Sequence, residues 1–190
     1  MTFPQRVDEY YTYADLITWD DDVSYELIEG VPIMMAPPSI THQRISGKLY
    51  LQIASFLKGR PCEVFHAPVG VRLNADLADD TVVQPDIVVV CDRSILDDKS
   101  IKGAPDMVIE ILSPPTASRD KVMKFNQYLR AGVRKYWIVH PDSKTVSVHV
   151  LKEGEYITRA YADTDAVPVH VLEGCTINLS DVFEDPISLL

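Results

Sequence analysis

The stretch Met107-Val108-Ile109-Glu110-Ile111-Leu112-Ser113-Pro114 places one carboxylate in the middle of a short apolar run that ends in proline. A run of this length, rich in β-branched residues and preceded by Gly103-Ala104-Pro105, predicts a buried central strand. Burying a carboxylate that has no partner is costly, because the charge loses its hydration. We therefore expect Glu110 to carry a proton or to contact a cationic partner or a metal ion.

A second acid and a lysine-bearing helix accompany this run. The apolar stretch 82–90 predicts another strand, with Asp86 at its start, and residues 116–129 predict a long helix. On that helix Lys121, Lys124 and Tyr128 are three and four residues apart, so they share one face. Two acids on apolar strands next to a helix with lysines are the parts of a divalent-metal phosphodiesterase site. The alternative interpretation is a solvated lysine face.

Length and composition favour one folded domain. The chain has 190 residues, of which 46% are hydrophobic and 24% charged, as in ordinary soluble globular proteins. We expect a single domain over residues 1–190. No apolar stretch reaches the roughly 18 residues that cross a bilayer, and the first residues do not form a signal peptide. These features predict a cytoplasmic protein that does not enter the membrane.

The three cysteines do not suggest a disulfide framework. Cys62, Cys91 and Cys175 are odd in number and widely spaced, and no two of them have the spacing of a metal knuckle. Free cysteines are among the most buried residue types. The sequence therefore predicts three buried free thiols.

The charge balance counts against tight DNA binding by a monomer. A net charge of −10 and a pI near 4.8 create a field that repels polyphosphate. One segment differs from the rest, because six basic residues stand there against the single acid Asp120. They are Arg119, Lys121, Lys124, Arg130, Arg134 and Lys135. This segment predicts a local basic patch.

The N-terminal part offers further acids. Asp20, Asp21 and Asp22 predict a solvated loop, with cation binding as the alternative. Glu29-Gly30 stands between two apolar stretches and predicts a two-residue hairpin turn. Glu26 belongs to the first of those strands. Its side chain can point outward into solvent or inward toward a site, and base rates favour the outward direction.

The segment 40–57 predicts the first long helix. Ile45, Leu49 and Ile53 recur at helical spacing, and Ser39 or Thr41 can serve as the N-cap. His42 lies in the first turn of this helix. It is either a polar residue of the helix start or a residue near the active site.

The C-terminal third predicts antiparallel strands. Residues 145–151, 156–161 and 167–172 alternate between polar and apolar side chains, as strands with one buried face do. His149 and His170 fall on polar positions of this alternation. We expect both histidines to lie on the surface.

Several of these motifs together resemble one known family. They are Pro85-Asp86, the stretch 105–114, Arg119-Asp120 with Lys124 and Tyr128, Gly132-Val133, Tyr136-Trp137-Ile138-Val139, residues 25–30 and 37–39, and His42. Between about Tyr10 and about Leu172 the chain is similar to the Uma-two family, which belongs to the PD-(D/E)XK nuclease superfamily. The resemblance implies an α/β restriction-endonuclease-like fold, in which helices flank a mixed sheet of the α+β kind that carries additional antiparallel strands.

The resemblance also implies a metal site. Asp86 takes the place of the aspartate in the PD element, and Glu110 that of the acid in the ExK element. A hard cation, Mg²⁺ or Mn²⁺, would be held by these carboxylates and by the main-chain carbonyl of Ile111, with waters as the other ligands. The cation would activate a water molecule and neutralise charge on the scissile phosphate.

The sequence departs from the superfamily pattern at the lysine. Leu112 stands at the ExK lysine position, so the resemblance assigns the amine to Lys124, with Lys121 in reserve. The first long helix supplies no acid, which leaves Glu26 as an auxiliary ligand. His42 and Tyr128 are the other auxiliary residues.

Two functions of different class follow from these observations. The first is a metal-dependent DNA endonuclease with Asp86, Glu110 and Lys124 as the catalytic set, expected to form a homodimer. The second is a catalytically silent nuclease fold that binds a protein partner or itself. Convergence of the three side chains within a few ångströms would favour the first.

Overall fold

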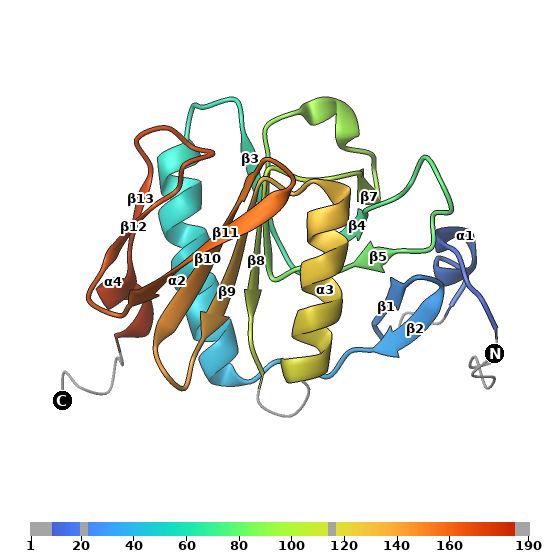
Figure 1. Cartoon of the computed structure of the whole chain (residues 1–190), viewed down its shortest axis with the longest axis horizontal. Helices are drawn as coiled ribbons and strands as arrows, with labels where there is room; N and C mark the ends of the chain where they lie inside the picture. The colour runs from blue at the N-terminus through green and yellow to red at the C-terminus, as the bar shows by residue number, and fades with distance from the viewer. Residues whose placement is uncertain (1–8, 20–22, 114–116, 185–190) are drawn as a thin grey trace.

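Two long helices cover the two faces of a mixed six-stranded sheet (Figure 1). The computed structural model describes residues 9–19, 23–113 and 117–184. Helix α2 (Ile40–Leu57) packs on one face of this sheet, and helix α3 (Ala117–Ala131) packs on the other. None of the helices in these ranges combines the length and the apolar character needed to cross a membrane.

The large sheet contains the predicted central strand. Its strands run in the order β11 (Glu155–Ala162), β10 (Thr145–Lys152), β9 (Lys135–His140), β8 (Met107–Ile111), β6 (Ile87–Val90) and β3 (Glu63–His66). β8 pairs in parallel with β9 and antiparallel with β6, so it is buried in the middle of the sheet. Met107 and Ile109 point toward α2, and alternation along the strand directs Val108 and Glu110 toward α3.

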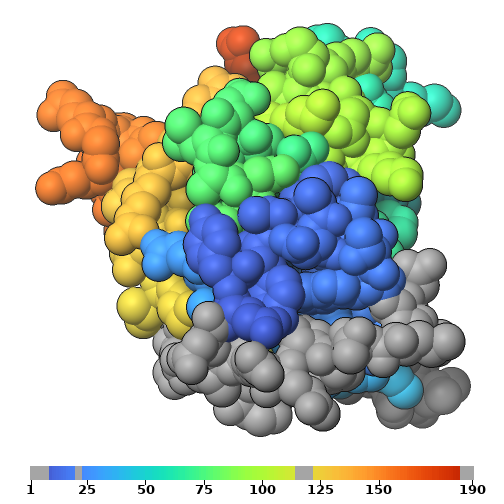
Figure 2. All heavy atoms as spheres, turned by 90° about the vertical axis from the view of Figure 1, so that its right-hand side faces the viewer, coloured from blue at the N-terminus to red at the C-terminus, as the bar shows by residue number. Residues whose placement is uncertain are grey.

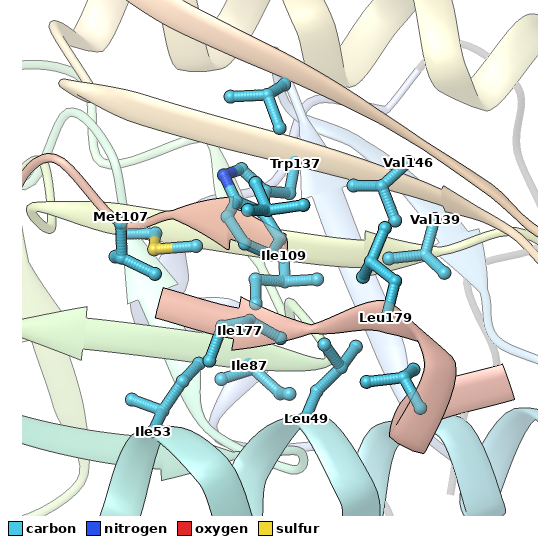
Figure 3. Packing of buried hydrophobic residues seen from close by; sticks show 14 of the residues in the cluster. Leu49, Ile53, Ile87, Met107, Ile109, Trp137, Val139, Val146, Ile177 and Leu179 are labelled. Atoms are coloured by element: carbon cyan, nitrogen blue, oxygen red, sulfur yellow. The ribbon is translucent and has the colours of Figure 1, made fainter. Parts of the chain in front are cut away.

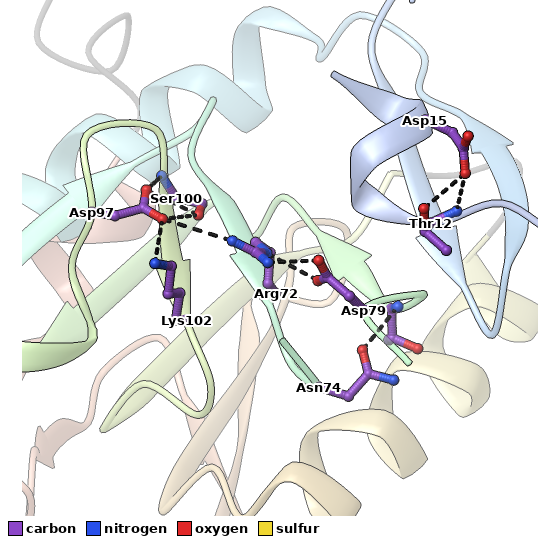
Figure 4. Close-up of polar contacts among 9 residues, drawn as sticks. Thr12, Asp15, Arg72, Asn74, Asp79, Asp97, Ser100 and Lys102 are labelled. Atoms are coloured by element: carbon purple, nitrogen blue, oxygen red, sulfur yellow. Dashed lines mark hydrogen bonds and ion pairs between the residues drawn. The ribbon is translucent and has the colours of Figure 1, made fainter. Parts of the chain in front are cut away.

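A smaller five-stranded sheet lies beside the first. Its order is β2 (Val31–Met34), β1 (Tyr25–Ile28), β5 (Val82–Val83), β4 (Gly70–Arg72) and β7 (Ser100–Lys102). The predicted turn at Glu29-Gly30 is confirmed, because both residues adopt the positive φ angles, 52° and 77°, that such a hairpin needs. Arg72 joins Asp79 through two hydrogen bonds of 2.9 and 2.6 Å, and Asp97 contacts Ser100 and Lys102 (Figure 4). These contacts fix the loops around β4 and β7.

The strand predicted over residues 82–90 is wrong as one element. β5 belongs to the small sheet and β6 to the large sheet, and Gln84-Pro85-Asp86 crosses between them. Proline lacks the N–H group that a continuous ladder would use, which explains why the strand is interrupted here. Asp86 therefore lies at the junction of the two sheets.

The main core fills the space between the large sheet and α2. Leu49 and Ile53 of α2 lie in one cluster with Ile109 and Trp137 of the sheet (Figure 3), and Ile45 belongs to the same cluster. The predicted helix is confirmed over residues 40–57, and the Ser39 side chain caps it by accepting a hydrogen bond from the main-chain N–H of His42 at 3.1 Å. The C-terminal residues close this core with β12 (Ala166–Pro168), β13 (Thr176–Asn178) and α4 (Leu179–Phe183). Two short helical turns complete the fold, α1 (Tyr13–Leu16) and η1 (Arg93–Ile95).

The prediction of three free thiols is wrong for two of them. Cys62 and Cys91 form a disulfide, whereas Cys175 is free and buried as predicted. Glu63 pairs with Val90 across β3 and β6, so the two cysteines stand opposite each other just beyond that pair. Sequence spacing does not reveal this pairing, since it depends on which strands become neighbours.

Reducing the disulfide is expected to lower the free energy of unfolding by about 3 to 4 kcal/mol. The 29-residue separation sets the entropy that the link removes from the unfolded chain. Urea unfolding of the wild type with and without reductant measures this difference. The Cys62→Ser variant serves as the control, because reductant should leave its transition unchanged. A wild-type transition that does not respond to reductant would contradict the prediction.

The predicted surface position of His149 is also wrong. His149 is buried, with its Nδ1 atom 2.7 Å from the hydroxyl of Thr158 and its ring against Phe125. β11 and α3 cover this position of β10, which the polar–apolar alternation alone cannot reveal. His170 is exposed, as predicted.

Lys135 does not belong to an exposed basic patch. It is fully buried, and its ammonium group donates a hydrogen bond to the main-chain oxygen of Pro168 at 2.7 Å. Burial lowers the pKa of Lys135 from its ordinary value of 10.5 to about 8. No carboxylate among the described residues forms an ion pair with it.

The wild type is expected to gain stability between pH 8 and pH 10 relative to a Lys135→Met variant. Because the folded pKa is the lower one, the unfolded chain binds more protons in this window, and the free energy of unfolding rises with pH. The gain is about 2 to 3 kcal/mol from the size of the shift. Urea unfolding of both proteins across this range measures it. The prediction would be contradicted if the difference in free energy of unfolding between the two proteins stays constant from pH 8 to pH 10.

Candidate active site

Six polar side chains from five elements form one connected cluster between the two sheets. Asp86 precedes β6 and Glu110 lies on β8, while Glu26 comes from β1 and His42 from the first turn of α2. Lys124 and Tyr128 project from α3. Each is one of the residues selected from the sequence, and the structure brings all six together.

The ammonium group of Lys124 lies between two acids. Its Nζ atom is 3.0 Å from Oε1 of Glu110 and 2.7 Å from Oε1 of Glu26. The Lys124 side chain is only 14% exposed, so the interpretation as a solvated lysine face is wrong at this position. The cationic partner that the buried Glu110 required is therefore present.

Tyr128 fixes Glu110 from the same helix face. Its hydroxyl donates a hydrogen bond of 2.6 Å to Oε1 of Glu110, and the side chain is fully buried. One turn of α3 thus supplies two donors to the same carboxylate oxygen. This agrees with the spacing of Lys124 and Tyr128, which puts them on one face.

Glu26 points inward, not into solvent as base rates favoured. The residue is 3% exposed, and Oε1 accepts a hydrogen bond of 2.7 Å from the main-chain N–H of Gln84. The inward direction follows from the position of β1, which lies in the interior of the small sheet between β2 and β5. Gln84 is a participant that the sequence did not indicate, because its contribution comes from the main chain.

Asp86 is held by two donors. Its Oδ2 atom accepts a hydrogen bond of 2.6 Å from the main-chain N–H of Ile111 and lies 3.2 Å from Nε2 of His42. Since Ile111 follows Glu110, the first contact brings the two acid-bearing segments together. His42 is buried beside the site, which supports the second of its two interpretations.

The electrostatics of the cluster reflect its burial. Burial raises the pKa of Glu110; Lys124 opposes this effect, and the charges of Asp86 and Glu26 add to it. Burial by itself would lower the pKa of Lys124, but its two acid partners raise it above the ordinary value. Burial likewise acts against the charged form of His42, yet the hydrogen bond that His42 donates to the Asp86 carboxylate raises the pKa of His42. Lys124 is thus a stable cation at neutral pH.

The donor set fits a hard divalent cation. Glu26 and Glu110 contact the single ammonium group of Lys124, and Asp86 lies on the neighbouring segment, where it accepts from the main-chain N–H of Ile111. Three carboxylates with one ammonium group leave an excess of negative charge. In residues 9–19, 23–113 and 117–184, no three His, Cys, Asp or Glu side chains are arranged as a ready metal cage. Two carboxylates and the carbonyl of Ile111 suit Mg²⁺, which retains several waters and is seldom enclosed by protein alone.

Two candidate groups fall outside this description. Lys121 lies on α3, but its side chain is outside the described part of the structure, so its reserve role stays a prediction. Asp20, Asp21 and Asp22 lie outside the described residues altogether. Neither interpretation of that acidic run is tested.

The fold and the cluster of acids with a lysine define a restriction-endonuclease-like protein. A family model described as "Putative restriction endonuclease" (Uma2) matches residues 7–180, and the chain belongs to this family. The match spans nearly the whole chain and confirms the resemblance found in its motifs.

Two further proteins are similar to this chain. A crystal structure described as that of a "putative nuclease belonging to DUF820" from Anabaena variabilis matches with a TM-score of 0.72 and 27% sequence identity, covering 89% of this chain and 94% of that one. It confirms the predicted mixed α+β, restriction-endonuclease-like fold. The uncharacterized protein slr1290 from Synechocystis is 24% identical over 167 residues, which are 86% of this chain and 84% of that protein.

Proposed function

We propose that this protein is a metal-dependent endonuclease that hydrolyses phosphodiester bonds of DNA. The observation that carries the proposal is the position of the Lys124 ammonium group, 3.0 Å from Glu110 and 2.7 Å from Glu26, with Asp86 on the adjoining segment. Membership of the restriction-endonuclease family supports the same reaction class. In hydrolysis a water oxygen bonds to phosphorus, the bond to the leaving oxygen breaks, and that oxygen receives a proton.

The contacts of each residue indicate its role in the proposed reaction. Asp86, Glu110 and the carbonyl of Ile111 would hold Mg²⁺ or Mn²⁺, which supplies an activated water and neutralises phosphate charge when bound. Lys124 presents a fixed positive charge to the phosphate oxygens. Glu26 and Tyr128 keep Lys124 and Glu110 in place, and His42 does the same for Asp86.

A homodimer is part of the proposal. Two sites related by a two-fold axis can cut both strands of a duplex in one complex, and the two-fold dimer is the commonest oligomer of soluble proteins. Dimer formation would also let basic residues of two copies act on one DNA, against the net charge of −10 of each chain. Light scattering that gives a monomeric mass would exclude the dimer.

One observation favours a second function, an interaction module without catalysis. Two cavities, of about 420 and 360 Å³, are lined by residues other than Asp86, Glu110 and Lys124. The acids of the cluster are already paired with protein donors. Such a closed and satisfied cluster also suits a fold that serves a protein partner or self-association.

A cleavage assay separates the two functions. Wild-type protein is incubated with supercoiled plasmid, linear duplex and single-stranded DNA, each with Mg²⁺ and with Mn²⁺. Cleavage that requires the metal supports the endonuclease. Intact substrate in all six mixtures overturns it and favours the interaction module. Calorimetric titration with Mn²⁺ adds an independent measure of the metal site.

A further inference from the structure

A cavity of about 420 Å³ lies between N-terminal residues and strands of the small sheet. Figure 2 shows the side of the molecule on which the N-terminal residues lie. Residues from α1, β1, β4 and β5 and from the adjoining loops line the cavity. They include Trp19, Ser24, Tyr25, Gln84 and Lys99. Its volume falls in the range of small-molecule sites, about 300 to 1,000 Å³.

The aromatic wall of this cavity is firmly held. The ring of Trp19 meets the rings of Tyr11 and Tyr25 edge to face, with both centroid distances at 5.2 Å. Trp19 itself is only half-buried, so part of its ring remains accessible. A fixed and partly exposed indole is a platform on which a flat ring can stack.

The polar groups of the cavity suit the edge of a nucleobase. The hydroxyl of Ser24 donates to Oε1 of Gln84, and Nε2 of Gln84 donates to the main-chain oxygen of Tyr25, both at 3.0 Å. A carboxamide and a hydroxyl can donate and accept, as the edges of bases require. Among the described residues that line the cavity, Lys99 is charged and none is acidic, although the chain carries a net charge of −10.

Gln84 connects this cavity with the candidate active site. Its side chain lines the cavity, while its main-chain N–H donates to Glu26 at 2.7 Å. Asp86 follows two residues later, at most about 7 Å along the chain. A nucleotide whose base enters the cavity can therefore extend its phosphate toward the acids.

We propose that this cavity, which we call the Trp19 pocket, receives an unpaired base of the nucleic acid substrate. The inference rests on the proposed nuclease function and adds the form of the substrate to it. A base in a duplex is stacked and paired, so only a single strand or an extruded base can enter the pocket. The protein then prefers unpaired nucleic acid to duplex.

The test measures the binding of labelled oligonucleotides by fluorescence anisotropy. EDTA is present so that metal-dependent cleavage does not occur. The probes are oligo-dT, oligo-U, a duplex of the same length and an oligo-dT strand with abasic positions. We expect the wild type to bind the single strands more tightly than the duplex and the abasic strand. Trp19→Ala should weaken single-strand binding on the order of 10-fold, the usual effect of losing one base-stacking side chain. A difference between oligo-dT and oligo-U shows that the 2′-hydroxyl group or the thymine methyl group affects binding.

Two further variants keep the test decisive should Trp19→Ala fold poorly. Lys99 is exposed, so Lys99→Glu should leave the fold intact. It should lower the affinity for single strands and make that affinity less dependent on salt concentration. Lys152→Glu makes the same charge change on the β10–β11 hairpin, away from the pocket, and should bind as the wild type does. Thermal melting checks the fold of each variant.

The outcomes separate the pocket from the nuclease. If oligo-dT, its abasic form and the duplex bind equally well, or if Trp19→Ala folds and binds unchanged, the Trp19 pocket is refuted, even when wild-type protein cleaves DNA. If the pocket variants lose binding but no DNA form is cleaved with Mg²⁺ or Mn²⁺, the pocket stands and the proposed catalytic function fails.

Discussion

Replacing Glu110 with glutamine should reduce metal-dependent DNA cleavage by about 10³-fold, the scale on which loss of one well-placed electrostatic group acts. The carboxamide retains an oxygen that can accept from Tyr128 and Lys124, so the packing of β8 against α3 should survive. The variant loses the negative charge that would hold Mg²⁺ or Mn²⁺ beside Asp86. Initial cleavage rates and calorimetric titration with Mn²⁺ measure the two effects separately.

The matched control for this experiment is Glu155→Gln. Glu155 begins β11 at the protruding hairpin and is exposed, so its replacement should leave cleavage and melting temperature unchanged. Equal cleavage by wild type and Glu110→Gln, with both proteins folded, would exclude Glu110 from the reaction. Lower activity that merely follows a lower melting temperature would assign Glu110 a structural role.

Replacing Lys124 with methionine should lower the free energy of unfolding by about 3 to 5 kcal/mol, the usual cost of removing one partner of a buried ion pair. Glu26 and Glu110 would both remain buried, with side chains only 4% and 12% exposed, and would lose their common cation. Urea unfolding measures the loss. Cleavage should disappear as well, because no other described ammonium group contacts these acids.

A double variant tests whether unpaired charge is the cause. Lys124→Met combined with Glu26→Gln removes one of the two stranded carboxylates, so it should be more stable than Lys124→Met alone. Lys58→Met, at an exposed position beyond α2, should change stability by no more than about 0.5 kcal/mol. Unpaired charge is not the cause if Lys124→Met is as stable as the wild type, or if the double variant is less stable than Lys124→Met.

The sequence predicted the central part of the site because local patterns specify it. An acid inside an apolar strand needs a partner, and helical spacing puts Lys124 and Tyr128 on the face that supplies one. The interruption at Pro85 and the inward direction of Glu26 depend instead on which strands join which sheet. The Cys62–Cys91 disulfide and the buried Lys135 have the same cause, since contacts between distant segments determine them.

Because Asp86 lies where one sheet gives way to the other, the relative position of the two sheets determines how its carboxylate faces Glu110. The β1–β2 turn is fastened to α3 by Glu29, which contacts Arg130 at 2.6 Å and Gln127 at 2.9 Å on the outer surface. Substitutions at Glu29, Gln127 or Arg130 can therefore adjust the distance between Asp86 and Glu110 without altering either acid. In the proposed nuclease, such substitutions would give relatives a route to different metal preferences while their inner residues stay the same.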